Sequence, residues 1–142
     1  MIRAGQPSDM AAITRVRTSV RENHLSVDEL AARGITPGSI IADMKSGDLG
    51  CWVADHDGVI AAFAMANRRE GKVWALFTEP QHEGRGHATA LLARCEEWLK
   101  TQGITEAILD TGRGTRAVAF YMRRGWHVSG YAENDVLMKK TL

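Results

Sequence analysis

The segment from Thr78 to Ala88 constrains the fold of this chain more than any other. An apolar run over residues 73–78 ends before Pro80, glycines follow at positions 84 and 86, and an amphipathic helical pattern begins at once. The first backbone N–H groups of a helix lack partners within it and carry a partial positive charge. Glycine lets such a backbone approach a ligand closely. A strand, a glycine turn and a helix in this order are typical of a phosphate or pyrophosphate site.

The spacing of these glycines does not match the common nucleotide motifs. The segment contains neither Gly-x-Gly-x-x-Gly nor Gly-Lys-Ser/Thr, which disfavours a dinucleotide-binding fold and a nucleotide hydrolase. Taken alone, the turn could be an ordinary loop before a helix, or could hold a different nucleotide. The junction therefore predicts an anion site without naming the anion.

Strand and helix patterns follow one another along the whole chain without a repeat or a linker. We expect strands at 2–4, 51–54, 59–66, 73–78, 107–110, 127–131 and 136–139. Expected helices run from a cap at Ser8-Asp9 to about residue 21, from 26 or 27 to 33, over 37–45, from about 86 to 101 and from about 115 to 124. Asp57-Gly58 predicts a tight hairpin turn. This order predicts one α/β domain over 1–142, a mixed sheet of about seven strands with helices on both faces.

Composition argues against several classes of partner. The chain has 18 basic and 17 acidic residues, a net charge of +1, so no overall field attracts nucleic acid or an anionic membrane. No stretch approaches the ~20 apolar residues of a membrane span, and the N-terminus lacks a signal peptide pattern. Cys51 and Cys95 show no ligand spacing, so we expect buried thiols, no zinc site and a cytoplasmic protein.

Two segments resemble motifs of the GNAT superfamily of acetyltransferases. Residues 80–92 look like motif A, Gln/Arg-x-x-Gly-x-Gly/Ala, with Glu83, Gly86 and Ala88 at the matching positions. Residues 117–126, Ala-Val-Ala-Phe-Tyr-Met-Arg-Arg-Gly-Trp, look like motif B, Ala-x-x-Phe-Tyr-x-x-x-Gly-Phe/Trp. The resemblance implies a GNAT-like fold in which an antiparallel meander is followed by a parallel strand pair, 74–78 and 107–111, that splays apart at a cofactor cleft.

The resemblance also implies acetyl-CoA as co-substrate, with no metal. The pantetheine arm would pair with the free edge of strand 74–78 like an added strand, and the loop N–H groups would hold the pyrophosphate. The residues that this places at the cofactor are Leu76, Phe77, Thr78, His82, Glu83, Gly84, Arg85, Gly86, His87, Ala88, Ala117, Phe120, Tyr121 and Arg124. From its position on the helix, Phe120 is also interpreted as a core residue.

The activity that the resemblance implies is transfer of an acetyl group to a primary amine by direct attack. Tyr121 occupies the family's position for giving a proton or hydrogen bond to the leaving thiolate, although an aromatic on such a helix is also a common core residue. For the base that removes the amine proton, Glu79 is the first candidate. Glu70, His82, Asp110 and a water relay stay open as alternatives.

Two positions depart from the family pattern. Glu83 places a carboxylate where Gln or Arg is usual, close to the expected diphosphate; we expect it to point away, with Arg85 supplying compensating charge. Gly114 stands where many relatives carry an asparagine that helps to order the loop before the last long helix. Both departures bear on the affinity for the cofactor.

The acceptor is the least constrained part of the hypothesis. Residues 21–24 lie where early helices of family members line the acceptor site, although a solvated helix terminus is the simpler interpretation of His24. The acceptor could be a small amine, an amino acid, an antibiotic, a protein N-terminus or a lysine, and a homodimer, frequent in the family, is left open. A non-catalytic acyl-CoA-binding sensor or partner-binding module is the alternative function.

Overall fold

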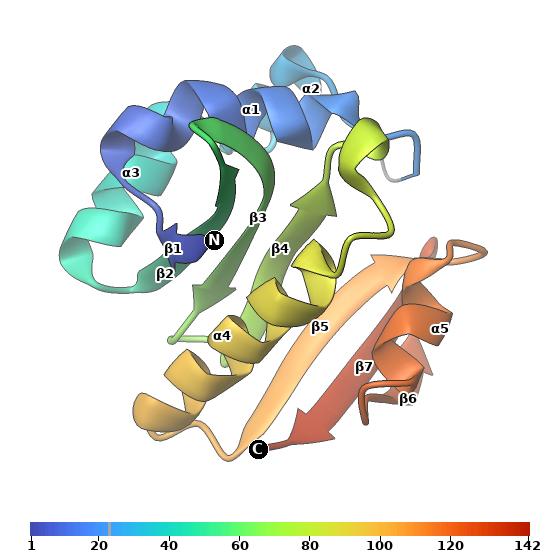
Figure 1. Cartoon of the computed structure of the whole chain (residues 1–142). Helices are drawn as coiled ribbons and strands as arrows, with labels where there is room; N and C mark the ends of the chain where they lie inside the picture. The colour runs from blue at the N-terminus through green and yellow to red at the C-terminus, as the bar shows by residue number, and fades with distance from the viewer. Residues whose placement is uncertain (23) are drawn as a thin grey trace.

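The fold is a single mixed sheet flanked by helices, in a computed structural model that describes residues 1–22 and 24–142 (Figure 1). The strand order is β1-β2-β3-β4-β5-β7-β6. The strands are β1 Ile2–Ala4, β2 Leu49–His56, β3 Val59–Asn67, β4 Lys72–Thr78, β5 Glu106–Gly112, β6 His127–Tyr131 and β7 Asp135–Thr141. The helices are α1 Met10–Ser19, α2 Val27–Ala32, α3 Pro37–Ser46, α4 His87–Thr101 and α5 Ala117–Met122, with the short 3-10 turns η1 Pro7–Asp9 and η2 Pro80–His82. The expected fold class, with a meander and one parallel pair, is confirmed.

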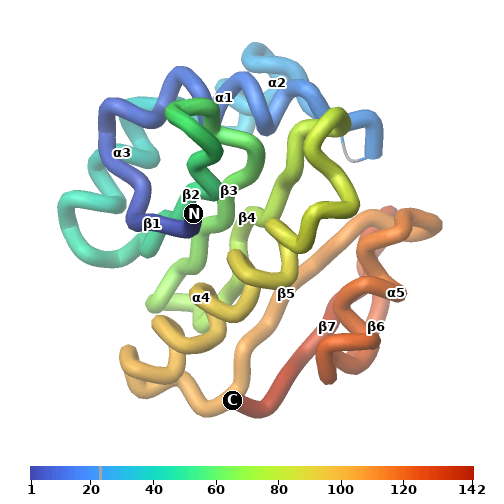
Figure 2. The backbone as a smooth tube through the Cα atoms, viewed as in Figure 1, coloured from blue at the N-terminus to red at the C-terminus, as the bar shows by residue number. Residues whose placement is uncertain are grey.

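The sheet consists of two antiparallel parts joined by a short parallel contact. β1 to β4 pair in sequence order as an antiparallel meander, and β5, β7 and β6 form the second part. Within the described residues, β4 and β5 pair at one position, where Lys72 lies opposite Ile108. Next to this pair, the Ile108 N–H donates to the Gly71 carbonyl at 2.9 Å. Figure 2 shows the two backbones separating beyond this point. The splayed strand pair is therefore present.

Helices cover both faces of the sheet because each carries an apolar stripe at helical spacing. α4 buries Leu91, Leu92, Cys95 and Leu99 against one face, and α5 packs on the same side (Figure 1). α1 and α3 pack against the opposite face and bury residues that meet the inward side chains of β2 and β3. The two faces thus have separate cores, and the cavities described below lie on both sides of the β4–β5 gap.

Both cysteines lie inside these cores as free thiols. Burial raises the pKa of the Cys51 thiol to about 12 and also raises that of Cys95, so both are inert apolar groups at neutral pH. This confirms their interpretation as buried residues. Over residues 1–22 and 24–142, we find no helix with the length and apolar character needed to cross a membrane.

Local turn chemistry explains several element ends. Asp57 and Gly58 both adopt positive φ, 51° and 84°, as a two-residue type I′ hairpin requires. Ser26 and Glu29 form the expected capping box at the start of α2, with reciprocal bonds of 3.1 Å. The hairpin and this helix start are therefore determined by residues close in sequence.

Several bounds differ from the sequence-based expectation. β2 extends two residues further at each end than expected, because backbone pairing with β3 continues from Leu49 to His56 regardless of side-chain polarity. α5 is shorter than expected, and Thr115, whose hydroxyl donates to the Gly112 carbonyl at 2.8 Å, belongs to the turn before it. Strand and helix ends depend on such hydrogen bonds more than on apolar periodicity.

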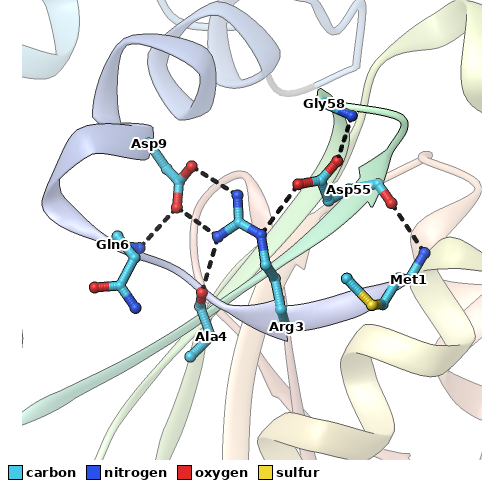
Figure 3. A network of polar contacts seen from close by, with 7 residues as sticks. All are labelled: Met1, Arg3, Ala4, Gln6, Asp9, Asp55 and Gly58. Carbon is cyan, nitrogen blue, oxygen red and sulfur yellow. Dashed lines mark hydrogen bonds and ion pairs between the residues drawn. The ribbon is translucent and has the colours of Figure 1, made fainter.

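The expected side-chain cap at the start of α1 is wrong in detail. Asp9 is the residue before α1, but its carboxylate accepts from the Gln6 N–H at 2.7 Å and from Arg3. Arg3 contributes two donors to Asp9, both at 2.9 Å, and its Nε donates to Asp55 at 3.1 Å (Figure 3). Asp55 in turn accepts from the Gly58 N–H at 2.8 Å (Figure 3). One arginine therefore ties β1 to η1 and to the β2–β3 hairpin.

We expect Arg3→Gln to lower the melting temperature at neutral pH, and the difference from wild type to shrink below about pH 4. The Arg3 hydrogen bond lowers the pKa of Asp9; the Gly58 N–H and then Arg3 lower that of Asp55, both from 3.8. A lowered carboxyl pKa contributes stability above the unfolded pKa, and this is lost as the pH falls through the folded value. Thermal unfolding at pH 7, 5 and 3 tests this, with Arg94→Gln, at an exposed position of α4, as the control. An equal difference at pH 7 and pH 3 would contradict the network's role.

Candidate active site

The loop between β4 and α4 has the geometry of an anion site. Gly84 and Gly86 adopt positive φ, 76° and 82°, and no described heavy atom lies within 4 Å of a Cβ built on either. Glycine is thus required here by backbone conformation and not by crowding. The helical hydrogen bonds of α4 begin with the Ala90 N–H donating to the Gly86 carbonyl at 3.2 Å. The N–H groups before Ala90 therefore lie at an open, positively polarised helix start.

This helix start forms one end of a cavity of about 1020 Å³ between β4, the glycine loop and α5. Every residue that the sequence placed at a cofactor lines it: Leu76, Phe77, Thr78, His82, Glu83, Gly84, Arg85, Gly86, His87, Ala88, Ala117, Phe120, Tyr121 and Arg124. We call this cavity the long cleft. Thr89, Arg116 and Arg123 also line it; the sequence reasoning missed them, and their position beside the two motifs was the signal that could have found them.

Arg124 joins the two helices that border the long cleft. Its guanidinium donates to the Thr89 hydroxyl on α4 through two nitrogens, at 2.6 and 3.1 Å. It also bonds to the Phe120 carbonyl at 3.0 Å and lies over the Phe120 ring, 3.9 Å from its centroid. Phe120 is half-buried against the core, which confirms its interpretation as a core residue, and it also lines the cleft. These contacts hold a positive charge at the cleft wall.

The charge of Glu83 is compensated by Arg116, and the expectation that Arg85 would do so is wrong. Arg116 donates to both carboxylate oxygens of Glu83, at 3.1 and 3.3 Å, and its Nε lies 3.5 Å from Glu22. Arg85 instead contacts the His82 ring, 3.2 Å from Nδ1. The difference arises because Arg116, far away in sequence, approaches Glu83 from the turn before α5.

Gly114, the second departure from the family pattern, lies in the turn between β5 and α5. Its φ is 72°, and no described heavy atom lies within 4 Å of an added Cβ. Glycine and asparagine are the residues that tolerate this left-handed conformation best. Glycine can therefore maintain the backbone course of this loop without the asparagine side chain.

Tyr121 lies where α5 meets the cleft, with 7% of its surface exposed. Its ring contacts Phe120 and Trp126 edge to face, with centroids 5.2 and 5.9 Å apart. Burial, followed by the charges of Cys95 and Asp110, raises the pKa of its hydroxyl. The phenol is protonated at neutral pH, as an ordinary tyrosine also is, and the raised pKa makes the buried phenolate form still less favourable.

The base candidates occupy different environments. Glu79 is buried, and its carboxylate is bound by Arg15 at 3.0 Å and by the side-chain amide of Gln81. His82, which lines the cleft, places Nε2 3.7 Å from that carboxylate. Glu70 is exposed in the β3–β4 turn, away from the cleft. Asp110 lines the cleft and pairs with Lys72 at 2.6 Å.

A second cavity, of about 550 Å³, opens on the other face of the sheet under α1, α2 and α3. We call it the side pocket. It shares Trp74, Ala75, Phe77, Asp110 and Thr111 with the long cleft, so the two meet where β4 and β5 part. His24 is exposed and lines the side pocket, whereas Arg21 and Glu22 line the long cleft. Asn23 lies outside the described residues.

A family model described as the Acetyltransferase (GNAT) family matches residues 12–126. The chain belongs to this family. Rat N-acetyltransferase 8 is 30% identical over 108 residues, which cover 70% of this chain and 47% of that protein. This GNAT chain thus spans about half the length of its curated relative.

Solved structures of other acetyltransferases share the whole fold of this GNAT domain. The PaiA N-acetyltransferase of Thermoplasma acidophilum, in complex with coenzyme A, has a TM-score of 0.85 at 18% identity, over 100% of this chain and 98% of that one. The yncA protein of Salmonella typhimurium, with its cofactor acetyl-CoA, has a TM-score of 0.77 at 19% identity, over 100% and 93%. At these identities the likeness shows the fold alone. In the part of the GNAT chain that is described, His, Cys, Asp and Glu side chains do not gather in threes as a metal site would require.

The desolvation of Tyr121 has a spectroscopic consequence. The chain has two tyrosines, so Tyr131→Phe leaves Tyr121 as the one phenol. We expect its ionisation, followed by tyrosinate absorbance, to occur well above pH 10, the pKa of a free tyrosine, because burial raises the pKa of Tyr121. Circular dichroism at each pH confirms that the protein is still folded. A midpoint at the free-tyrosine value in the folded protein would show that the hydroxyl is solvated.

Proposed function

We propose that this GNAT protein transfers an acetyl group from acetyl-CoA to a primary amine by direct attack within a ternary complex. The observation that carries the proposal is the meeting of the two cavities at Phe77, which lines both. The long cleft leads from that point to the glycine loop, and the side pocket leads from it to the opposite face. Two reactants that enter from different sides would therefore meet beside one strand. The coenzyme A and acetyl-CoA bound to the similar structures support the assignment of the donor.

The long cleft offers the groups that coenzyme A requires. Beyond Lys72, the edge of β4 that faces β5 lies along the cleft, so backbone groups of Leu76 to Thr78 would pair with the amides of the pantetheine arm. The N–H groups of the glycine loop and the start of α4 would bind the pyrophosphate. Arg124, held by Thr89, would add positive charge to that end.

In the reaction, the amine nitrogen attacks the thioester carbonyl carbon, the new C–N bond forms, and the C–S bond breaks. A backbone N–H near Phe77 would polarise the carbonyl oxygen as negative charge develops on it. The departing sulfur would take a proton or a hydrogen bond from Tyr121, whose hydroxyl, like that of any tyrosine, is protonated at neutral pH. Coenzyme A then leaves as the thiol, and the N-acetyl product remains.

The amine must first lose a proton. Because Glu79 is held by Arg15 and lies 3.7 Å from His82 Nε2, it would receive this proton by way of His82, which lines the long cleft. Asp110, which lines both cavities, and a water relay are the other routes. Comparing the loss of kcat in Glu79→Gln, His82→Gln and Asp110→Asn would separate these routes.

Replacing Tyr121 by Phe tests the proposed proton donor. We expect kcat for thiol release from acetyl-CoA to fall on the order of 10²-fold, because the variant removes one acid–base group. The affinity for coenzyme A should stay within about threefold, since the ring and its packing remain. Thiol release across an amine panel and calorimetric titration with coenzyme A measure the two effects. An unchanged kcat across the panel would remove Tyr121 from the mechanism.

Coenzyme A binding without turnover by the wild type would identify a non-catalytic acyl-CoA-binding module.

Replacing Gly86 by Ala tests the glycine loop. A left-handed residue with a Cβ costs about 1–2 kcal/mol, so we expect that loss of stability. Coenzyme A affinity should fall roughly tenfold or more as the loop N–H groups turn away from the pyrophosphate. Gly103→Ala is a matched control at the far end of α4, since Gly103 has φ 85° and no described heavy atom near an added Cβ. Equal affinity in the two variants would contradict a pyrophosphate site at this loop.

A further inference from the structure

The side pocket combines apolar, basic and acidic side chains, a combination that acetyl transfer by itself does not require. Part of its lining is apolar and is formed by the side chains of Met10, Ile13, Ile40, Phe63 and Met65, from two helices and the sheet, beside polar and charged residues. A volume of about 550 Å³ falls within the range of small-molecule sites. Such a surface favours an acceptor that buries an apolar group, because removing that group from water is favourable.

One wall of the side pocket is cationic. Arg17 of α1 is half-buried, and its guanidinium carbon lies 4.1 Å from the centroid of the Phe77 ring. Arg33, which follows α2, lines the same pocket. Burial, and then the nearby charge of Arg33, lowers the pKa of Arg17. Two arginines that line one cavity favour a ligand with a carboxylate, to which arginine binds through paired hydrogen bonds.

Another wall of the side pocket is anionic. Asp110 belongs to β5, and Glu133 and Asp135 belong to the connection between β6 and β7 and the start of β7. The Asp110 carboxylate is held by Lys72 at 2.6 Å, at the point where the two cavities meet. This wall favours an ammonium group that approaches from the side pocket.

We propose that the acceptor is a free α-amino acid with an apolar side chain, an inference that rests on the transferase function proposed above. The carboxylate binds Arg17, the amine lies beside Phe77 on the Asp110 side, and the side chain packs on the apolar surface. The α position follows from the place of Arg17: its guanidinium stacks on Phe77, which lines both cavities. A carboxylate bound there brings an amine on the neighbouring carbon to the reaction point, whereas a distant ε-amine would overshoot it.

The balanced reaction forms the amide bond between the α-nitrogen and the acetyl carbon and breaks the thioester C–S bond. The ammonium form of the amino acid loses two protons in total. One proton is balanced by the proton that the sulfur gains as coenzyme A leaves as a thiol. The other proton is released to solvent. The carboxylate bound at Arg17 is unchanged by the reaction.

Three acceptors of matched shape test the proposal: L-phenylalanine, L-phenylalaninamide and phenethylamine, assayed by thiol release with wild-type protein and acetyl-CoA. We expect kcat/KM for L-phenylalanine to exceed that for each of the other two at least tenfold, the size of one charge-assisted interaction. Equal or faster reaction of phenethylamine would overturn the proposal while leaving the transferase function intact. Equal reaction of the amide would also overturn it, and would favour a polypeptide N-terminus.

Arg17→Met shows whether Arg17 causes the preference for an acceptor with a carboxylate, since methionine keeps an apolar group over Phe77. We expect the ratio of kcat/KM between L-phenylalanine and phenethylamine to fall toward one, and Arg17→Lys to keep part of it. Arg94→Met, at an exposed position of α4, is the control and should keep the wild-type ratio. Melting temperatures confirm that the variants are folded. A wild-type ratio in Arg17→Met would overturn the role of Arg17.

A binding measurement separates failure of this proposal from failure of the transferase function. N-acetyl-L-phenylalanine and N-acetylphenethylamine are titrated calorimetrically into the protein saturated with coenzyme A, which requires no turnover. We expect the carboxylate-bearing ligand to bind at least tenfold more tightly, and Arg17→Met to abolish the difference. If no amine releases thiol, yet this preference is found, the transferase function fails and the amino-acid site stands. Equal binding of the two ligands would overturn the amino-acid site.

Discussion

The short contact between β4 and β5 determines where the two cavities of this molecule can form. Among the described residues the two strands share one backbone pair, Lys72 with Ile108, and the ion pair of Lys72 with Asp110 lies at the same junction. Beyond it, the β4 backbone has β3 on one side and the long cleft on the other. A sheet that continued its ladder here would have closed both cavities. The parting of two parallel strands therefore brings the glycine loop, α5 and α1 to one place.

Charges on separate elements border this gap, and each is held by a partner distant in sequence. Arg116 pairs with Glu83 and Glu22 across one side of the long cleft, and Arg124 ties α5 to Thr89 at the start of α4. For the proposed pyrophosphate site, the Glu83–Arg116 pair has a clear consequence. The carboxylate that would repel the ligand is neutralised by an arginine that also lines the cleft, so the departure from the family pattern does not leave an uncompensated charge.

The sequence was informative where one or a few neighbouring residues decide the outcome. Asp57-Gly58 specifies its hairpin because the type I′ turn needs two positive φ angles, and Ser26 with Glu29 specifies a helix start by local bonds. Predictions that depended on contacts between different elements were less successful. Asp9 was expected to cap α1 but binds Arg3, and Glu83 was expected near Arg85 but binds Arg116. Contacts of this kind depend on how elements pack against one another, and the sequence pattern of a single element does not predict that packing.

By itself, the amino-acid sequence determined the order of elements, the glycine loop and the residues that line the long cleft, since apolar periodicity, turn chemistry and two motifs are all local. The tertiary structure alone decided where Glu79 and Arg17 lie. Glu79 is held by Arg15 away from the cleft surface, and Arg17 stacks on Phe77 inside the side pocket. Both results follow from how α1 packs across β3 and β4. The glycine loop of the long cleft is thus encoded locally, and the lining of the side pocket is set by long-range packing.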